Sequence, residues 1–473
     1  MVSPLLRTKP LAMILQEPDE AKVALKRVLG PWDLVALGIG CIIGVGIFVL
    51  PGVEAANHAG PGIILSFVIA GAACACAALC YAELAAMIPV AGSAYTYGYA
   101  TLGEFVAWII GWDLILEYMV GACLVSIGWS AYLVNLINHL LEPAGLVVPH
   151  AWCTAPWGPN PGILNLPSVL IVGTLCWLLV RGIRESSKVN FAMVVVKVSA
   201  ILVFIGLAAW HVNPSNWTPF APFGFKGIMT AAAIVFLAYV GFDAVSTTAE
   251  EAINPQRDMP IGIIGSLVVA TVLFVAVAAI MTGVVPYYRL GVADPVALVL
   301  DVLHKPWASV LVSIGALTGI TSVLLVLLLG QPRILYAMSR DGLLPEALSR
   351  VHPRYRTPYM TTIVTGAIVA TASALLPINV VAELCAIGTL FAFMIVSGGV
   401  IVLRRTRPDV PRPFRAPLFP YVPALGVLLC GYLMFSLPAM TWVRFLLWLG
   451  IGLILYGTYG IKRSKLATAQ PVQ

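Results

Sequence analysis

The chain has 473 residues, of which 60% are hydrophobic and only 10% are charged, and its mean hydropathy is +0.96. Soluble domains carry about 25% charged residues. This composition therefore excludes an ordinary soluble enzyme or binding module and predicts a multi-pass membrane protein. The formal net charge of +6 would fit a nucleic-acid partner, but the positions of the basic residues give it another meaning.

The first 30 residues are polar and basic and contain several prolines. They lack the short apolar core that a cleavable signal peptide needs. We therefore expect residues 1–30 to form a cytoplasmic segment, and the first apolar stretch to serve as its own insertion signal.

Twelve apolar segments follow, each about 18 to 25 residues long, which is enough to cross a bilayer as a helix. They begin near Leu34, Ile63, Phe105, Val169, Phe191, Ile228, Ile263, Trp307, Thr361, Val380, Pro423 and Phe445. The sequence thus predicts an all-α polytopic membrane protein with 12 transmembrane helices. An even number of spans places both termini on the same side.

Most of the 27 Lys and Arg residues lie before the first span, in every second loop or in the tail. These groups fall at 7–27, 181–188, 257, 333–356, 404–415 and 462–465, whereas the intervening loops hold only Lys226, Arg289, Lys305 and Arg444. This bias is the positive-inside pattern and predicts cytoplasmic termini in the cytoplasmic membrane. The excess of positive charge is therefore explained by the orientation of the protein in the membrane, and we expect no nucleic-acid partner.

The spans divide into two blocks of five, residues 31–211 and 226–405, followed by two further helices in 406–461 and a cytoplasmic tail, 462–473. Because five is odd, the second block begins on the opposite side of the membrane from the first. The two blocks are therefore predicted to be inverted repeats, an arrangement common among secondary transporters.

The first span of each block carries a helix-breaking pattern. Residues 38–48 contain four glycines, and Gly241 stands two residues before Asp243 in the sixth span. Glycine costs a helix about 1 kcal/mol relative to alanine, and unwound backbone persists at bilayer depth only beside a protein or water cavity. Paired breaks predict a substrate site; the alternative is close helix packing, which Gly40 and Gly44 would also fit.

A broken helix offers unpaired N–H groups to a carboxylate and unpaired C=O groups to an ammonium group. A free amino acid carries both groups on one carbon. The predicted site therefore matches the backbone of an amino acid before any side-chain pocket is considered.

Lys197 is the basic residue that falls inside an apolar span, within residues 191–209. It lies nine residues beyond Lys188, roughly 13 Å along a helix, which is deeper than a lysine stem can recover by snorkelling. A charge at this depth is expensive. We expect Lys197 to face the protein interior and to titrate as part of the mechanism, rather than to face lipid.

Two carboxylates also fall near mid-depth, Glu117 in the third span and Asp243 beside the second break, with Asp113 one turn from Glu117 on the same face. They are predicted either to exchange protons or face a cationic substrate, or to form a fixed hydrogen bond between the third and sixth helices. Both alternatives remain open, and no histidine lies at mid-depth to carry the proton instead.

Five strings occur in order: GIGCIIGVGIF, YAELAAMIPVAGSAYTY, GEFVAWIIGWDLILEY, VGFDAVSTTAEEAINPQRDMPIGI and MSRDGLLP. Together they resemble the amino acid–polyamine–organocation superfamily, and within it the cationic amino acid transporter branch. The resemblance implies the LeuT-like fold, a 5+5 inverted repeat plus two C-terminal helices. Substrate would lie between the first, third, sixth and eighth helices.

The resemblance also implies roles for individual residues. The substrate-binding residues would be Ile42, Ile43, Gly44, Val45, Gly46, Phe236, Leu237, Ala238 and Gly241. Lys197 would contact the first helix and Thr321 or Ser322 on the eighth. Val45 stands where the family often has a hydroxyl, and Leu237 where it often has an aromatic gate.

The sequence therefore predicts a proton-coupled L-amino acid symporter that works by alternating access, with Lys197, Glu117 and Asp243 coupling the proton, and with broad or neutral specificity. The alternatives are a cationic amino acid (Arg/Lys) transporter, a proton-independent exchanger and, more remotely, a non-transporting sensor. HExxH and GxSxG motifs are absent from the sequence. We expect no enzymatic activity, cofactor or metal.

Overall fold

In the computed structural model, the described residues are 29–465 except 89–92, 142–146, 158–160, 182–186, 247, 248, 250, 251, 293 and 356. Regular structure in this part of the chain is helical, apart from the isolated bridges Leu29–Ala252 and Cys153–Asn165. The all-α prediction is confirmed. Of the predicted terminal segments 1–30 and 462–473, residues 1–28 and 466–473 fall outside the described residues.

Seven helical spans in the described chain are long and apolar enough to cross a membrane. They are Leu50–Met87, Glu104–Asn138, Phe191–His211, Pro255–Val284, Pro306–Arg340, Ile378–Thr406 and Ala439–Arg463. Five shorter apolar helices accompany them: Pro31–Ile42, Leu166–Val180, Gly224–Tyr239, Tyr359–Leu375 and Tyr421–Phe435. The protein is therefore a multi-pass membrane protein.

The first half of the bundle contains α2 (Pro31–Ile42), α3 (Val45–Phe48), α4 (Leu50–Glu54), α5 (Ile63–Met87), α6 (Ser93–Thr101), α7 (Glu104–Leu141), α8 (Leu166–Val180) and α9 (Ser187–Ala208). The second contains α10 (Gly224–Val235), the short 3₁₀ element η8 (Phe236–Tyr239), α11 (Phe242–Ser246), α12 (Pro255–Val284), α13 (Pro295–Val302), α14 (Pro306–Arg340), α15 (Tyr359–Leu375) and α16 (Ile378–Thr406). The chain continues through α17 (Tyr421–Phe435), α18 (Ala439–Leu455) and α19 (Ile461–Arg463).

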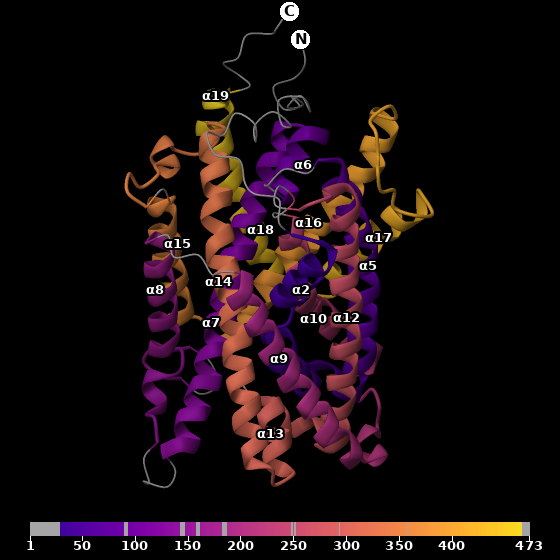
Figure 1. Ribbon diagram of the computed structural model, residues 1–473, viewed down its shortest axis with the longest axis vertical. Helices are drawn as coiled ribbons and strands as arrows, with labels where there is room; N and C mark the ends of the chain where they lie inside the picture. Colours follow the sequence, from indigo (N-terminus) through magenta and orange to yellow (C-terminus); the bar gives the residue numbers. More distant parts are fainter. Residues whose placement is uncertain are drawn as a thin grey trace, which may run out of the picture.

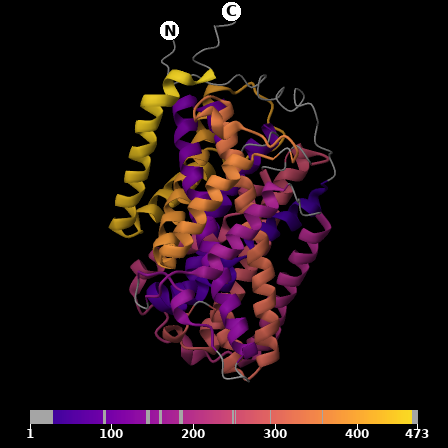
Figure 2. The ribbon, with the colours of Figure 1, turned by 90° about the vertical axis from the view of Figure 1, so that its left-hand side faces the viewer.

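The long helices run side by side, with α2 and α10 near the centre of the view (Figure 1). Helix α12 packs against α2 and α5, and α14 packs against α7 and α9. The C-terminal helices lie on one side of the bundle (Figure 2). This packing places the short, interrupted helices in the interior, where longer helices surround them.

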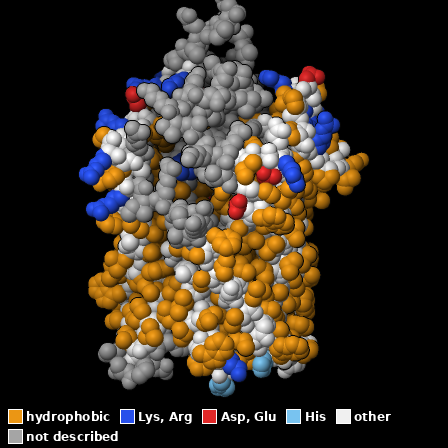
Figure 3. Space-filling model, viewed as in Figure 1, with side chains coloured by type: hydrophobic (Ala, Val, Ile, Leu, Met, Phe, Trp, Pro, Cys, Tyr) orange, Lys and Arg blue, Asp and Glu red, His pale blue; other side chains and the backbone are white. Residues whose placement is uncertain are grey.

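Lys and Arg side chains gather toward the upper end of the visible face, whereas hydrophobic side chains predominate over the lower part that is drawn in colour (Figure 3). An apolar band between polar ends is the surface that a bilayer requires. Which end of the molecule faces the cytoplasm stays a prediction from the positions of the basic residues.

Helix α18 packs against α7 through a pair of stacked tryptophans. The rings of Trp112 and Trp448 are 4.6 Å apart and nearly parallel. Each indole N–H donates a hydrogen bond to the other residue's carbonyl oxygen, at 2.8 and 3.1 Å. Gly452 lies beneath Trp112, so closely that a Cβ there would be 2.4 Å from the ring. The last apolar helix is thereby held against the helix that carries Glu117.

Candidate functional site

The first predicted break is present. Helix α2 ends at Ile42, Ile43 takes an extended conformation (φ −78°, ψ 98°), Gly44 also departs from helical geometry (φ −153°, ψ −134°), and α3 resumes at Val45. A helix that stops and restarts exposes carbonyl groups on one side of the gap and N–H groups on the other.

The second predicted break is also present. Helix α10 ends at Val235 and tightens into η8. The chain then extends at Val240 (φ −60°, ψ 133°), and α11 begins after Gly241, whose φ of +130° is a conformation that residues with a side chain rarely adopt. The Gly241 N–H donates to Asp243 Oδ1 at 2.9 Å, so this carboxylate stabilises the interruption.

The two breaks contact each other. A Cβ on Gly46 would lie 2.6 Å from Ala238 Cα, and one on Gly241 would lie 2.8 Å from the carbonyl carbon of Cys41. Gly44 is packed in the same way against Val323. The sequence posed helix breaking and close packing as alternatives, but these glycines do both, because the interruptions can meet only where side chains are absent.

Beside the breaks is a cavity of about 50 Å³. Its wall includes seven of the nine predicted substrate-binding residues, Ile42, Gly44, Val45, Gly46, Leu237, Ala238 and Gly241, together with Glu117 and Asp243. Helices α7 and α14 contribute mainly apolar side chains to the same wall, among them Leu124, Val125, Val323, Val326 and Leu327. A space of this size holds a few water molecules, so binding an amino acid requires the surrounding helices to move apart.

Two predicted substrate-binding residues lie outside this wall. The Ile43 carbonyl accepts a hydrogen bond from Lys197. The Phe236 ring is fully buried against Phe393 of α16, with the ring centres 5.4 Å apart. In this conformation Leu237, rather than the neighbouring phenylalanine, faces the cavity.

The predicted carboxylates bond to different helices. Glu117 Oε1 accepts from Thr389 Oγ1 of α16 at 2.9 Å, whereas Asp243 Oδ2 accepts from the Tyr118 hydroxyl of α7 at 3.3 Å. One predicted alternative was a fixed hydrogen bond between the third and sixth helices. Asp243 makes such a bond, to Tyr118, whereas Glu117 bonds to α16 instead. Among the described atoms, Glu117 Oε2 and both Asp113 carboxylate oxygens are buried without a hydrogen-bond partner. Buried carboxylate oxygens of this kind need water, a proton or a ligand.

Lys197 is fully buried in α9. Its Nζ donates to the carbonyl oxygens of Gly40 and Ile43 and to Ser322 Oγ, the last two at 3.0 Å. These acceptors match the three donors of an ammonium group, and the two carbonyls belong to the C-terminal end of α2, which favours a cation. This geometry disagrees with a lysine that faces lipid.

Thr321 is placed differently from its neighbour Ser322. Its hydroxyl accepts from Trp129 Nε1 at 2.9 Å and donates to the Leu317 carbonyl at 2.6 Å. Consecutive residues of a helix point in different directions. Of the two candidates on α14, Ser322 is therefore the one bonded to Lys197 through its side chain.

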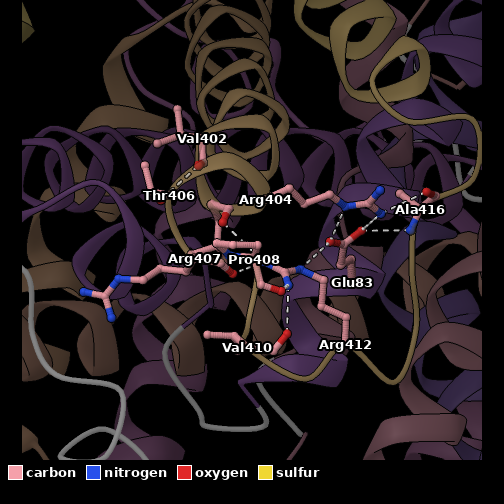
Figure 4. Close-up of polar contacts among 10 residues, drawn as sticks. Glu83, Val402, Arg404, Thr406, Arg407, Pro408, Val410, Arg412 and Ala416 are labelled. Atoms are coloured by element: carbon pink, nitrogen blue, oxygen red, sulfur yellow. Dashed lines mark hydrogen bonds and ion pairs between the residues drawn. The ribbon is translucent and has the colours of Figure 1, made fainter.

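A buried ion-pair cluster joins the end of α5 to α16 and the loop that follows it (Figure 4). Arg404 donates to both carboxylate oxygens of Glu83, and Arg412 Nε lies 3.5 Å from the same group. The Ala416 N–H donates to Glu83 at 2.8 Å. Glu83 is only 1% exposed, and its contacts organise the loop.

Glu83→Ala is expected to lower the free energy of unfolding by about 3–5 kcal/mol, because removing one partner of a buried pair leaves the other charge uncompensated. Thermal unfolding in detergent measures the loss. Glu346→Ala, at an exposed glutamate, is the control and should have no effect. Equal stability of the two variants would contradict the role given to the cluster.

A hydrophobic helical bundle with two interrupted helices meeting at a central cavity defines a membrane transporter of small molecules. The profile of the amino acid permease family matches residues 29–456. The chain belongs to this family, within the amino acid–polyamine–organocation superfamily, and is an amino acid transporter, as the five motifs predicted.

Relatives of similar length include three informative proteins. The chain is 51% identical over 447 residues to a branched-chain amino acid permease of Bacillus subtilis (strain 168), covering 94% of this chain and 95% of that one. It is 44% identical over 465 residues to a methylthioribose transporter of the same organism, covering 98% and 100%. It is 32% identical over 497 residues to cationic amino acid transporter 1 of Arabidopsis thaliana, covering 92% and 83%.

The sequence did not predict the apolar part of the cavity wall from α7 and α14, or two hydrogen-bond donors, Tyr118 and Thr389. Tyr118 could have been considered from the sequence, because it directly follows Glu117 in a predicted helix. Thr389 had no such signal, since its contact with Glu117 joins positions 272 residues apart.

Proposed function

We propose that the protein is a secondary active transporter that carries neutral aliphatic L-amino acids across the cytoplasmic membrane together with protons. The observation that carries this proposal is the pair of contacting helix breaks that line one cavity together with apolar side chains of α7 and α14. In this proposal the chain spans the membrane twelve times as a 5+5 inverted repeat plus two helices, with both termini cytoplasmic.

The backbone of the substrate is recognised at the breaks. Its carboxylate accepts hydrogen bonds from N–H groups of Gly44 to Gly46, and its ammonium group lies against carbonyls of the Phe236–Gly241 interruption. Its side chain lies against the apolar wall of α7 and α14. The proposal draws support from the branched-chain permease to which the chain is 51% identical, and from the lack of a hydroxyl at Val45.

In this proposal, Lys197 couples the transport of the substrate to the movement of a proton. Protonated, its ammonium group ties the end of α2 to α9 and α14; deprotonated, it releases them and lets the helices around the cavity rearrange. Glu117 and Asp243 face the cavity and are the further proton-coupling candidates. One proton moving down 100 mV supplies about 2.3 kcal/mol, which corresponds to roughly 50-fold accumulation.

A second candidate is a cationic amino acid transporter, which the buried and unpartnered Glu117 Oε2 in the cavity wall favours. An arginine or lysine side chain could pair with this oxygen. Under this alternative Glu117→Gln removes arginine binding; under the neutral-substrate proposal it leaves leucine binding in place and alters only its pH dependence.

Uptake into proteoliposomes tests the proposal. We expect saturable leucine uptake that an inward proton gradient increases, by up to about 50-fold at 100 mV. Arginine and methylthioribose in the same assay identify the other substrate classes. Counterflow without gradient-driven uptake would instead establish an exchanger, and ligand binding without any flux would establish a sensor.

A further inference from the structure

Gly121 lies in α7 one turn beyond Glu117 and lines the cavity. It sits in the middle of a 38-residue helix, where glycine is less favourable than alanine by about 1 kcal/mol. A glycine at such a position calls for a reason in packing or in function.

Packing explains the other glycines of the cavity wall but not this one. At Gly44 and Gly46 a Cβ would collide with Val323 and Ala238 at 2.8 and 2.6 Å, and Gly241 has a φ of +130°. At Gly121 the nearest atoms would be Cys385 Sγ and Leu327 Cδ1, both at 3.5 Å, which is ordinary van der Waals contact. The fold could therefore accept alanine at this position.

The space left open at Gly121 is apolar and lies between three helices. Leu327 comes from α14 and Cys385 from α16, and both line the cavity with Gly121. Leu124, three residues along α7, continues the same wall. The two breaks line the same cavity, so a substrate whose backbone groups bind there can extend its side chain toward Gly121.

We propose that Gly121 determines how large a side chain the transporter accepts. The methyl group that it lacks leaves room for the terminal carbons of a branched aliphatic substrate. This inference rests on the proposed function and names one residue of the substrate site that limits the size of the substrate. One methylene group in an apolar pocket changes selectivity by about 10-fold to 200-fold.

The test compares leucine and alanine uptake by Gly121→Ala in proteoliposomes. We expect the leucine-to-alanine ratio of kcat/KM to fall at least 10-fold, with the loss in leucine transport and with alanine transport retained. Gly206→Ala is the matched control, because a Cβ there would have no heavy atom within 4 Å; it should leave the ratio unchanged.

Leu327→Ala supplies a second, independent measurement. It removes the side chain that a methyl at position 121 would touch, so it should favour large substrates, and the double variant should recover leucine transport relative to Gly121→Ala. A ratio within twofold of the wild type in Gly121→Ala would overturn the proposal. So would equal loss of both substrates, or, if Gly121→Ala does not fold, an unchanged ratio in Leu327→Ala. Failure of the wild-type protein to transport either amino acid would instead overturn the proposed function.

Discussion

Lys197→Met is expected to abolish proton-driven accumulation, so that the ratio of internal to external leucine falls from as much as about 50 to about 1. Methionine is close to lysine in length but cannot donate or titrate. It would leave the Gly40 and Ile43 carbonyls and the Ser322 hydroxyl without the ammonium group that now binds all three. The Ser322 hydroxyl keeps its bond to the Gly319 carbonyl, but each buried carbonyl left unsatisfied costs about 1–3 kcal/mol, which also weakens the attachment of α2 to α9.

A second substitution separates this structural loss from the loss of the proton. Lys197→Gln keeps two N–H donors but does not titrate. We expect it to bind leucine and to carry out counterflow, with no response to a pH gradient. Lys226→Met, at an exposed lysine, should behave as the wild type. A Lys197 variant that transports with an unchanged pH dependence would contradict the coupling role.

Gly241→Ala is expected to remove transport almost completely, by more than 100-fold, and to destabilise the protein by about 2–6 kcal/mol. Backbone strain in a sparsely populated region contributes about 1–3 kcal/mol, and overpacking contributes a similar amount. Both apply here, because φ is +130° and the new Cβ would lie 2.8–2.9 Å from backbone atoms of Cys41 and Ile42.

Gly173→Ala is the control for this substitution. Gly173 lies in α8, and a Cβ there would have no heavy atom within 4 Å. Thermal unfolding and leucine uptake should therefore be unchanged, or stability slightly raised by the better helix propensity of alanine. If Gly241→Ala matched this control in both measurements, the second interruption would not be part of the transport mechanism.

The sequence predicted the features that depend on position along the chain. Four clustered glycines located the first interruption and a glycine close to a carboxylate located the second, and the depth of Lys197 in an apolar span showed that it must be buried. Ser322 was named as a partner because the family resemblance supplied it. In each case one local sequence pattern, or one family motif, was enough to predict the feature.

Features that depend on helix rotation and on distant contacts were not predictable. Whether Phe236 or Leu237 faces the cavity depends on how η8 turns against α16, and Phe236 packs against Phe393 instead. The Glu83–Arg404 pair joins residues 321 positions apart. Apolar patterning in a membrane protein marks depth but barely distinguishes helix faces, because lipid and protein interior are both hydrophobic.

The most direct measurement is a cryo-electron microscopy structure of the protein with bound L-leucine. The carboxylate should lie about 3 Å from backbone nitrogens in the stretch Gly44 to Gly46, with the side chain against Gly121 and Leu327. Leucine bound elsewhere, or continuous helices through residues 42–46 and 236–241, would contradict the account.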